Sequence, residues 1–344
     1  MYIRSFGSDN HATVHPRLIE ALSEVNHFQV PSYGTDHWSQ ETSKLFAREF
    51  GLKTESYLVF NGTAANVLSL RSLVKSYQSV FCSDISHIFR DECAAPEVLA
   101  GVKLIPVLSK NGKLTVEELE KNWMRRGDQH FAQTQGISIT QPTEVGTVYS
   151  IEELKDIIQW SKQKKIKIHI DGARLANAAV SLGKDFRDFT SDLGVDIVSF
   201  GGSKNGFMLG EAVVFCNPSL AEEFRYIRKQ YLQLPSKSRY IAAQFIAYFK
   251  ESLWQEIAKT SIDRAIQLKE QIKDLKQIEI QYSVDANSIF PKIPREWLKP
   301  LREKYFFYVW EEKDCICRWM TSWDTSIEDV NGFAAEISRL AQRT

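Results

Sequence analysis

Short runs of apolar, β-branched residues recur along the first two thirds of the chain, and segments with helical periodicity separate them. The strand-like runs lie near residues 57–60, 80–82, 102–107, 137–140, 167–171, 196–200 and 212–215. Between them, residues 39–50 and 64–75 have amphipathic helical patterns, and Ser150 with Glu153 has the spacing of a capping box. Apolar strands that alternate with helices are typical of a largely parallel sheet covered on both faces. We therefore predict an α/β fold that binds ligands at the carboxyl ends of its strands.

The pattern changes beyond residue 219. Long helical patterns run through 219–275 with a break near 234–236, and shorter strand patterns follow around 278–290 and 305–320 before a terminal helix that opens near Ser326. At 344 residues the chain also exceeds the size at which one core stops growing. We predict an N-terminal arm and large domain over residues 1–245, and a small α+β C-terminal domain over residues 246–344.

Composition excludes some classes of partner. Hydrophobic residues make up 43% of the chain, charged residues 25%, and the formal net charge is +0, so no basic field indicates nucleic acid or an anionic membrane. No apolar run is long enough to cross a bilayer, and the first ten residues lack an apolar signal core. Five dispersed cysteines suit a reducing compartment, and Cys315 with Cys317 lacks a second ligand pair. The expectation is a cytoplasmic protein without a metal site.

An aspartate and a lysine follow two predicted strands. Asp171 ends the strand 167–171, where it is either a helix cap or an ion-pair partner of Arg174, or else meets a buried cation of a ligand. Lys204 lies in a glycine-rich turn after strand 196–200, where the alternative is an ordinary surface lysine. A pyridoxal cofactor needs this pair, because an amine holds it covalently and a carboxylate keeps its pyridine nitrogen protonated.

A third junction adds a place for the phosphate of such a cofactor. Asn61-Gly62-Thr63 connects the strand near 57–60 to the helix that follows it. Glycine lets the backbone approach an anion closely, and the free N–H groups at a helix N-terminus favour a phosphate. Together the three junctions predict a site for pyridoxal 5'-phosphate.

The same residues carry a resemblance to a known family. Asp171-Gly-Ala-Arg174, the Leu-Ala-Asn-Ala after it and Gly-Gly-Ser-Lys204 resemble the threonine aldolase family of the β-eliminating lyase group, which are fold-type-I pyridoxal phosphate enzymes. The resemblance extends over nearly the whole chain. It includes Ser8-Asp9, Tyr33-Gly34, Gly62-Thr63, Ser86-His87-Ile88 and the segment 317–323. It implies an aspartate-aminotransferase-like fold.

The resemblance also implies roles for individual residues. Lys204 would bond covalently to the cofactor, Asp171 would contact its pyridine nitrogen, and His87 would stack on its ring and take part in proton transfer. Gly62 and Thr63 would hold the phosphate. Ser8, Arg174 and Arg318 would bind the substrate α-carboxylate, which suits guanidinium groups. Without the resemblance, His87 is explained as a half-buried histidine and Arg318 as a charge on an exposed strand face.

Two segments depart from the family pattern. The glycine-rich stretch that many members have after an Arg-Lys pair is absent after Arg228-Lys229, and Lys237 or Arg239 would instead be the basic residue that reaches the phosphate, often from the neighbouring subunit. After the strand 137–140, residues 141–147 read Gln-Pro-Thr-Glu-Val-Gly-Thr, where better-known aldolases have Asn-Thr-His. That histidine has been assigned a part in the aldol chemistry, so the departure leaves the substrate open.

The activity implied by the resemblance is the retro-aldol cleavage of a β-hydroxy-α-amino acid, such as L-threonine or L-allo-threonine, to glycine and an aldehyde. The base for the β-hydroxyl proton stays open among His87, a bound water, His11, His37 and Asp36. Two alternatives remain: β-elimination from another amino acid with the same cofactor, and a cofactor-binding protein without turnover. A homodimer or homotetramer with shared active sites is expected by resemblance.

Overall fold

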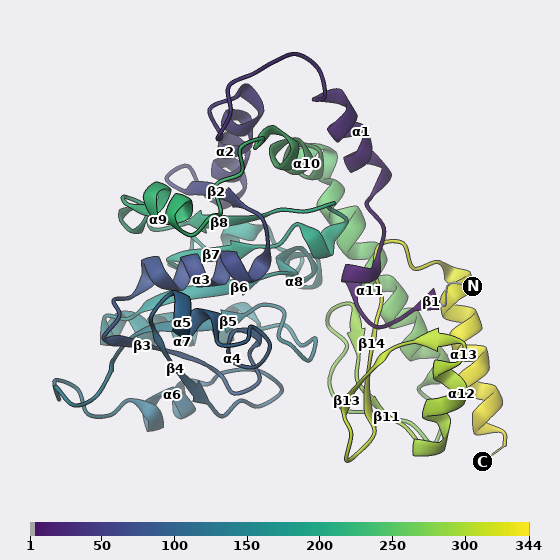
Figure 1. Ribbon diagram of the computed structural model, residues 1–344. Coiled ribbons are helices and arrows are strands. Elements are labelled where there is room, and N and C mark those ends of the chain that lie inside the picture. Colours follow the sequence, from purple (N-terminus) through teal and green to yellow (C-terminus); the bar gives the residue numbers. More distant parts are fainter. Residues whose placement is uncertain (1–3, 344) are drawn as a thin grey trace.

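A seven-stranded sheet lies at the centre of the computed structural model, which describes residues 4–343 (Figure 1). In spatial order its strands are β2 (Glu55–Val59), β8 (Glu211–Phe215), β7 (Ile197–Phe200), β6 (Lys167–Gly172), β5 (Gln133–Thr140), β3 (Gln78–Ser83) and β4 (Lys103–Val107). Only β8 runs against its neighbours, and the other six strands point the same way. The prediction of a largely parallel sheet is confirmed.

Helices bury both faces of this sheet. One face packs against α3 (Gly62–Leu73), α4 (His87–Arg90), α5 (Ala95–Leu99) and α9 (Phe224–Gln230). The other face packs against α1 (Pro16–Glu24), α2 (His37–Phe50), α6 (Val116–Asn122), α7 (Ile151–Lys164), α8 (Leu175–Leu182), α10 (Arg239–Phe249) and α11 (Leu253–Ile272). Along β7, Ile197 packs against the helices on the first face while Val198 and Phe200 pack against those on the second, which explains why apolar residues point to both faces of the strand.

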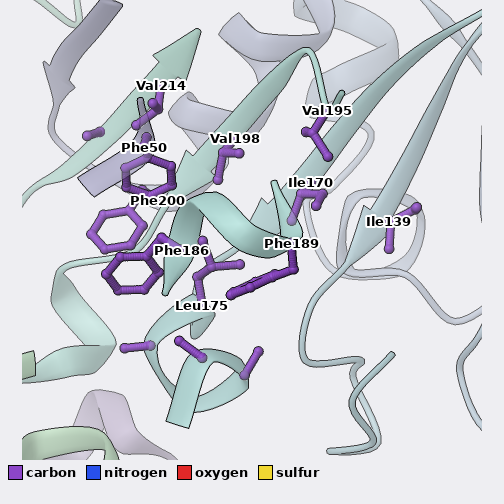
Figure 2. Close-up of a cluster of buried hydrophobic side chains, with 14 of the residues drawn as sticks. Phe50, Ile139, Ile170, Leu175, Phe186, Phe189, Val195, Val198, Phe200 and Val214 are labelled. Atoms are coloured by element: carbon purple, nitrogen blue, oxygen red, sulfur yellow. The ribbon is translucent and has the colours of Figure 1, made fainter. Parts of the chain in front are cut away.

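Aromatic rings fill much of the core between the sheet and the helices on its second face. Figure 2 shows the ring of Phe186 together with the rings of Phe50 from α2 and Phe200 from β7. The centroids of the three rings lie 5.1 to 5.4 Å apart. The ring planes of Phe50 and Phe186 are nearly parallel, and Phe200 meets both edge-on, which are the preferred geometries of aromatic pairs. This packing holds the end of β7 rigidly, one turn before Lys204.

The helix starts follow local capping. The Ser150 side chain accepts the Glu153 N–H at 3.1 Å and the Glu153 carboxylate accepts the Ser150 N–H at 2.7 Å, so the predicted capping box opens α7. The helix after β2 begins at Gly62, two residues earlier than its periodicity indicates, because the Asn61 side chain accepts the Ala64 N–H at 2.9 Å.

A smaller antiparallel sheet forms near the C-terminus. It contains β9 (Glu279–Ile280), β10 (Ser288–Ile289), β11 (Pro291–Lys292), β13 (Tyr308–Glu311) and β14 (Ile316–Met320), with α12 (Leu298–Arg302) and α13 (Ile327–Ala341) beside it. The N-terminal strand β1 (Arg4–Ser5) pairs in parallel with β12 (Tyr305–Phe306), and Figure 1 shows it close to α13. The α+β character of this part is confirmed. The boundary near residue 245 falls inside α10 and stays a prediction.

The structure also bears on membrane-spanning helices and on metal sites, the two features considered in the sequence. No helix within residues 4–343 combines the length and the apolar character that crossing a membrane requires. Across the same residues, no three His, Cys, Asp or Glu side chains gather in an arrangement suited to a metal ion.

Candidate active site

The sheet topology brings the three predicted junctions to one edge. Asp171 ends β6, Lys204 lies in the short helix η3 (Ser203–Asn205) after β7, and Gly62 opens α3 after β2. These three strands are parallel, so their carboxyl ends meet at the same edge. The reversed strand β8 begins there, which places Glu211 beside the Lys204 turn.

A cavity of about 310 Å³ opens at this edge. It is lined by eight of the nine residues for which the sequence predicts roles: Ser8, Gly62, Thr63, His87, Asp171, Arg174, Lys204 and Arg318. His11 lines it as well. The cavity lies between the large sheet and β13 and β14 of the small sheet, because Tyr308, Trp310 and Arg318 form one wall.

Four predicted candidates lie outside the cavity lining. Lys237 is exposed, and the Arg239 guanidinium donates to the carbonyl oxygens of His27 and Phe28 at 3.2 and 2.9 Å. Asp36 caps α2 through the Ser39 N–H at 2.9 Å, and His37 is exposed. Within one chain, none of the four is placed to touch a ligand in the cavity.

The amine of Lys204 is free to react. It makes no hydrogen bond or ion pair within residues 4–343, although its side chain is largely removed from solvent. Burial lowers the pKa of Lys204, and the nearby Arg174 charge lowers it further. Both effects favour the neutral, nucleophilic amine that covalent attachment requires.

Asp171 is held by neutral donors. One carboxylate oxygen accepts the Asn66 side-chain N–H at 2.9 Å and the other accepts the Ala173 N–H at 3.1 Å. Arg174 pairs with Asp9 instead, so the alternative of an Asp171–Arg174 ion pair is wrong. Only 5% of Asp171 is exposed, and its carboxylate has no cationic partner among the described residues. A protonated ring nitrogen would supply one.

His87 belongs to the same network. Its Nδ1 lies 2.8 Å from Glu92 Oε1, and the Asn66 side chain donates to that same oxygen at 2.8 Å. Asn66 of α3 therefore connects Glu92 to Asp171. The hydrogen bond that Glu92 accepts from the imidazole raises the pKa of His87. Because Nδ1 is occupied, Nε2 is the nitrogen left to face the cavity.

The guanidinium groups of Arg174 and Arg318 also line the cavity. Arg174 Nη2 donates to Asp9 Oδ1 at 3.0 Å, and Arg318 Nη2 donates to the Gly7 carbonyl oxygen at 3.0 Å. The Arg318 guanidinium stacks on the Tyr308 ring, 5.1 Å from its centroid, and its buried Nε has no partner within residues 4–343. Burial and the Arg174 charge lower the pKa of Arg318. An anion bound here would relieve that repulsion.

The N-terminus of α3 leaves room for a phosphate. A Cβ added at Gly62 would meet no atom within 4 Å, so the space in front of this turn is open. Asn61 occupies the Ala64 N–H, and the N–H groups of Gly62 and Thr63 have no partner in residues 4–343. The free N–H donors, the lysine amine without a partner and the aspartate without a cationic partner fit the phosphate, the aldehyde and the ring nitrogen of pyridoxal phosphate.

Four carboxylates in the lining were not assigned from the sequence: Asp91, Glu92, Glu211 and Glu144. Glu211 accepts the N–H groups of Gly202 and Ser203 and so holds the Lys204 turn, and burial raises its pKa to about 7. Glu144 accepts the His87 N–H at 2.8 Å, and burial raises its pKa to about 7. The sequence signal for Glu144 was the unusual segment 141–147, whereas Glu211 looked like an ordinary strand residue.

Comparison with known proteins agrees with this geometry. The sequence profile described as "Beta-eliminating lyase" matches residues 5–294. The chain belongs to the beta-eliminating lyase family. Two relatives in the family are named low specificity L-threonine aldolase: one from a Pseudomonas species is 38% identical over 97% of both chains, and one from Pseudomonas aeruginosa is 36% identical over 98% of this chain and 97% of its own.

A solved structure supports the same assignment. The threonine aldolase of Leishmania major superimposes with a TM-score of 0.94 at 26% identity, covering 98% of this chain and 99% of its own. The predicted family and fold are therefore confirmed, and the chain is a lyase of the threonine aldolase type. Membership in the beta-eliminating lyase family implies pyridoxal 5'-phosphate as the cofactor and an amino acid as the substrate.

Proposed function

We propose that this chain uses pyridoxal 5'-phosphate to cleave a β-hydroxy-α-amino acid, L-threonine or L-allo-threonine, to glycine and an aldehyde. The observation that carries the proposal is the partner-free Lys204 amine in one cavity with Asp171 and two arginines. The names of the relatives support the substrate class.

Each end of the cofactor has a candidate partner. Lys204 would hold it covalently, Asp171 would accept a hydrogen bond from its ring nitrogen, and the Gly62 and Thr63 N–H groups would bind its phosphate. His87 would lie against the ring through an imidazole fixed by Glu92. When bound, pyridoxal phosphate supplies an electron sink for the pair released at the substrate Cα.

The two arginines would orient the substrate. Arg174 and Arg318, with the Ser8 hydroxyl, would bind the α-carboxylate opposite Lys204. A substrate held by its amino group alone could rotate about the Cα–N bond, and binding of its carboxylate would fix that rotation and so set which bond at Cα aligns with the electron sink. Orientation of this kind is a large part of catalysis. Buried guanidinium groups suit this task because they keep their charge.

We also propose a homo-oligomer in which Lys237 or Arg239 approaches the phosphate of a neighbouring chain. The segment around Lys237 lies beside residues 28–33, because the Tyr33 N–H donates to the Ser236 carbonyl oxygen at 2.9 Å. Phe28 and Leu232, with 83% and 82% of their surfaces exposed, lie in these two segments. Exposed apolar side chains of this size favour an interface. Sedimentation velocity of the purified protein tests the assembly, and a monomer contradicts it.

The cofactor site is tested by Lys204→Ala. We expect the variant to lose both the visible absorbance of the lysine-bound cofactor and the cleavage of L-threonine, because the covalent link has no substitute in the cavity. Lys53→Ala, at an exposed position outside the cavity, is the matched control. A Lys204 variant that keeps its absorbance and its turnover contradicts the proposal.

The reaction type is tested by its products. Cleavage between Cα and Cβ of L-threonine yields glycine and acetaldehyde, whereas elimination from a β-substituted amino acid such as L-serine yields pyruvate and ammonia. We expect stoichiometric glycine and aldehyde from L-threonine or L-allo-threonine. Release of pyruvate and ammonia alone would favour the elimination alternative, and a protein that binds cofactor without any turnover would favour the non-catalytic one.

A further inference from the structure

Glu144 combines two features that the proposed function has not used. It lies in the loop after β5 and lines the cavity, and its Oε1 accepts the His87 N–H at 2.8 Å. Its Oε2 is shielded from solvent and makes no well-formed hydrogen bond within residues 4–343, although the Thr140 side chain lies close enough to lower the pKa of Glu144. A buried carboxylate oxygen without a partner is costly, so a site that retains one is suited to a ligand group that donates to it.

Four other carboxylates line the cavity, and of these Asp91 is exposed, so water can hydrogen-bond its oxygens. Glu92 also has a shielded Oε2 without a partner, but its side chain is 0% exposed and its Oε1 is held by His87 and Asn66, so it is less accessible to a substrate than Glu144. Glu211 receives the N–H groups of Gly202 and Ser203, and Asp171 receives Asn66 and Ala173. Glu144 is half-buried, so part of its side chain reaches the cavity surface.

The position of Glu144 relative to the substrate follows from the two fixed points. The amino group would lie toward Lys204 and the carboxylate toward Arg174 and Arg318, so the side chain on Cα has the remaining wall to face. Glu144 and His87 belong to that wall, and they are joined through the His87 N–H. A hydroxyl on Cβ is the donor that this arrangement would meet first.

We propose that Glu144 is a catalytic residue that accepts the proton of the substrate β-hydroxyl group on Oε2 while Oε1 stays bound to the His87 N–H. This inference rests on the proposed function. As the Cα–Cβ bond breaks, the O–H electron pair becomes the second bond of the aldehyde C=O and the proton passes to Glu144. The electron pair of the broken bond stays with Cα, and a proton added there completes glycine.

The ionisation of Glu144 suits this task. Burial raises its pKa to about 7, and a general base is most effective when its pKa lies near the working pH. Below that pH Glu144 is protonated and cannot accept the proton, so the cleavage rate rises with pH through about 7. The titratable or charged groups that act on it are Cys82, His87, Tyr149, Asp171 and Arg174.

The experiment compares two reactions of the cofactor-loaded protein. Cleavage of L-threonine needs a base at the β-hydroxyl, whereas exchange of the glycine α-hydrogens for deuterium does not, because glycine has no Cβ. For Glu144→Gln we expect the cleavage kcat to fall by about 100-fold or more, the usual contribution of a general base. Glycine exchange, followed by proton NMR, stays close to the wild-type rate. Glu152→Gln, which removes an exposed carboxylate of α7, is the matched control.

Three other outcomes would contradict the role of Glu144 as the base. If Glu144→Gln slows cleavage and glycine exchange equally, Glu144 acts only by positioning His87 and the inference is wrong. It is also wrong if the variant cleaves L-threonine at the wild-type rate. If the wild-type protein cleaves no β-hydroxy amino acid, the proposed function is wrong, and the inference about Glu144 is wrong as well because it rests on that function. The two failures are therefore distinguishable.

Two further measurements do not depend on a stable glutamine variant. In wild-type protein we expect the rate of L-threonine cleavage to rise with pH through about 7. We expect no such rise in the rate of glycine hydrogen exchange. In carboxyl ¹³C NMR of the glutamate-labelled protein we expect two resonances that titrate near pH 7, one from Glu211 that remains in Glu144→Asp and one from Glu144 that is absent from this variant. If the rates of cleavage and glycine exchange rise with pH in the same way, or if no resonance sensitive to this substitution titrates there, the proposal is overturned.

Discussion

At the scale of single residues, the site depends on buried groups whose partners come from different elements. Asn66 of α3 connects Asp171 of β6 to Glu92, and Glu92 fixes the imidazole of His87. Sequence patterns identified Asp171 and Lys204 because each directly follows a strand, and the resemblance supplied His87. Glu92 and Asn66 were missed, because nothing in the sequence around them indicates a contact with a residue 5 or 105 positions away.

Glu211 provides a prediction about stability and pH. Burial raises its pKa from 4.5 to about 7, so the folded protein holds this proton more tightly than the unfolded chain. The contribution of Glu211 to stability is therefore present below pH 4.5 and is lost as pH rises to about 7. We expect Glu211→Gln to remove this decline. Urea unfolding of both proteins at several pH values measures it, and identical slopes would contradict it.

At the scale of elements, the periodicity of the sequence was enough to locate all seven strands of the large sheet, because each is apolar on both faces. Periodicity did not reveal the direction of β8. The direction of a strand depends on the segment that connects it to the previous strand. Residues 201–210 reverse the direction of the chain, so β8 pairs with β7 in antiparallel orientation. The start of α3 was missed by two residues, because the Asn61 cap includes Gly62 and Thr63 in the helix against their low propensity.

The turn that carries Lys204 provides the second prediction. A Cβ added at Gly201 would lie 2.1 Å from the Ala173 carbonyl oxygen, a clash with backbone that no side-chain movement relieves. We expect Gly201→Ala to lower the melting temperature and to weaken cofactor binding, because the turn and Asp171 approach each other through this contact. Gly62→Ala is the control for stability, since its Cβ would meet open space. Equal melting temperatures for the two variants would contradict this account.

At the scale of the whole molecule, the N-terminal arm joins the two sheets. Asp9 accepts hydrogen bonds from Arg174, which follows β6, and from Asn287 beside the small sheet at 3.2 Å. The Phe6 carbonyl oxygen accepts the Met320 N–H at 2.7 Å, and β1 pairs with β12. The cavity is closed on this side by a segment whose Asp9 is 165 residues from Arg174 and 278 residues from Asn287 in sequence.

Asp9→Asn is the third prediction. Asp9 is 2% exposed, and neutralising it leaves the buried Arg174 charge without its partner. We expect the free energy of unfolding to fall by about 3–5 kcal/mol, the usual cost of breaking a buried pair from one side. Asp314→Asn is the control, because its pair with Lys292 is exposed to solvent and contributes little to stability. Urea denaturation checks both, and a similar small loss for the two variants would contradict the role of Asp9.

What the sequence determined by itself were the features that local physics dictates. Apolar runs define strands, the Ser150 box defines a helix start, and the residues that follow strands mark the ligand edge at Asp171, Lys204 and Gly62. The tertiary structure decided which groups meet. It paired Arg174 with Asp9 rather than Asp171, placed Lys237 outside the cavity, and left Glu144 with one free oxygen beside His87. Those outcomes depend on side chains that are distant in sequence, and only the packing of the two sheets brings them together.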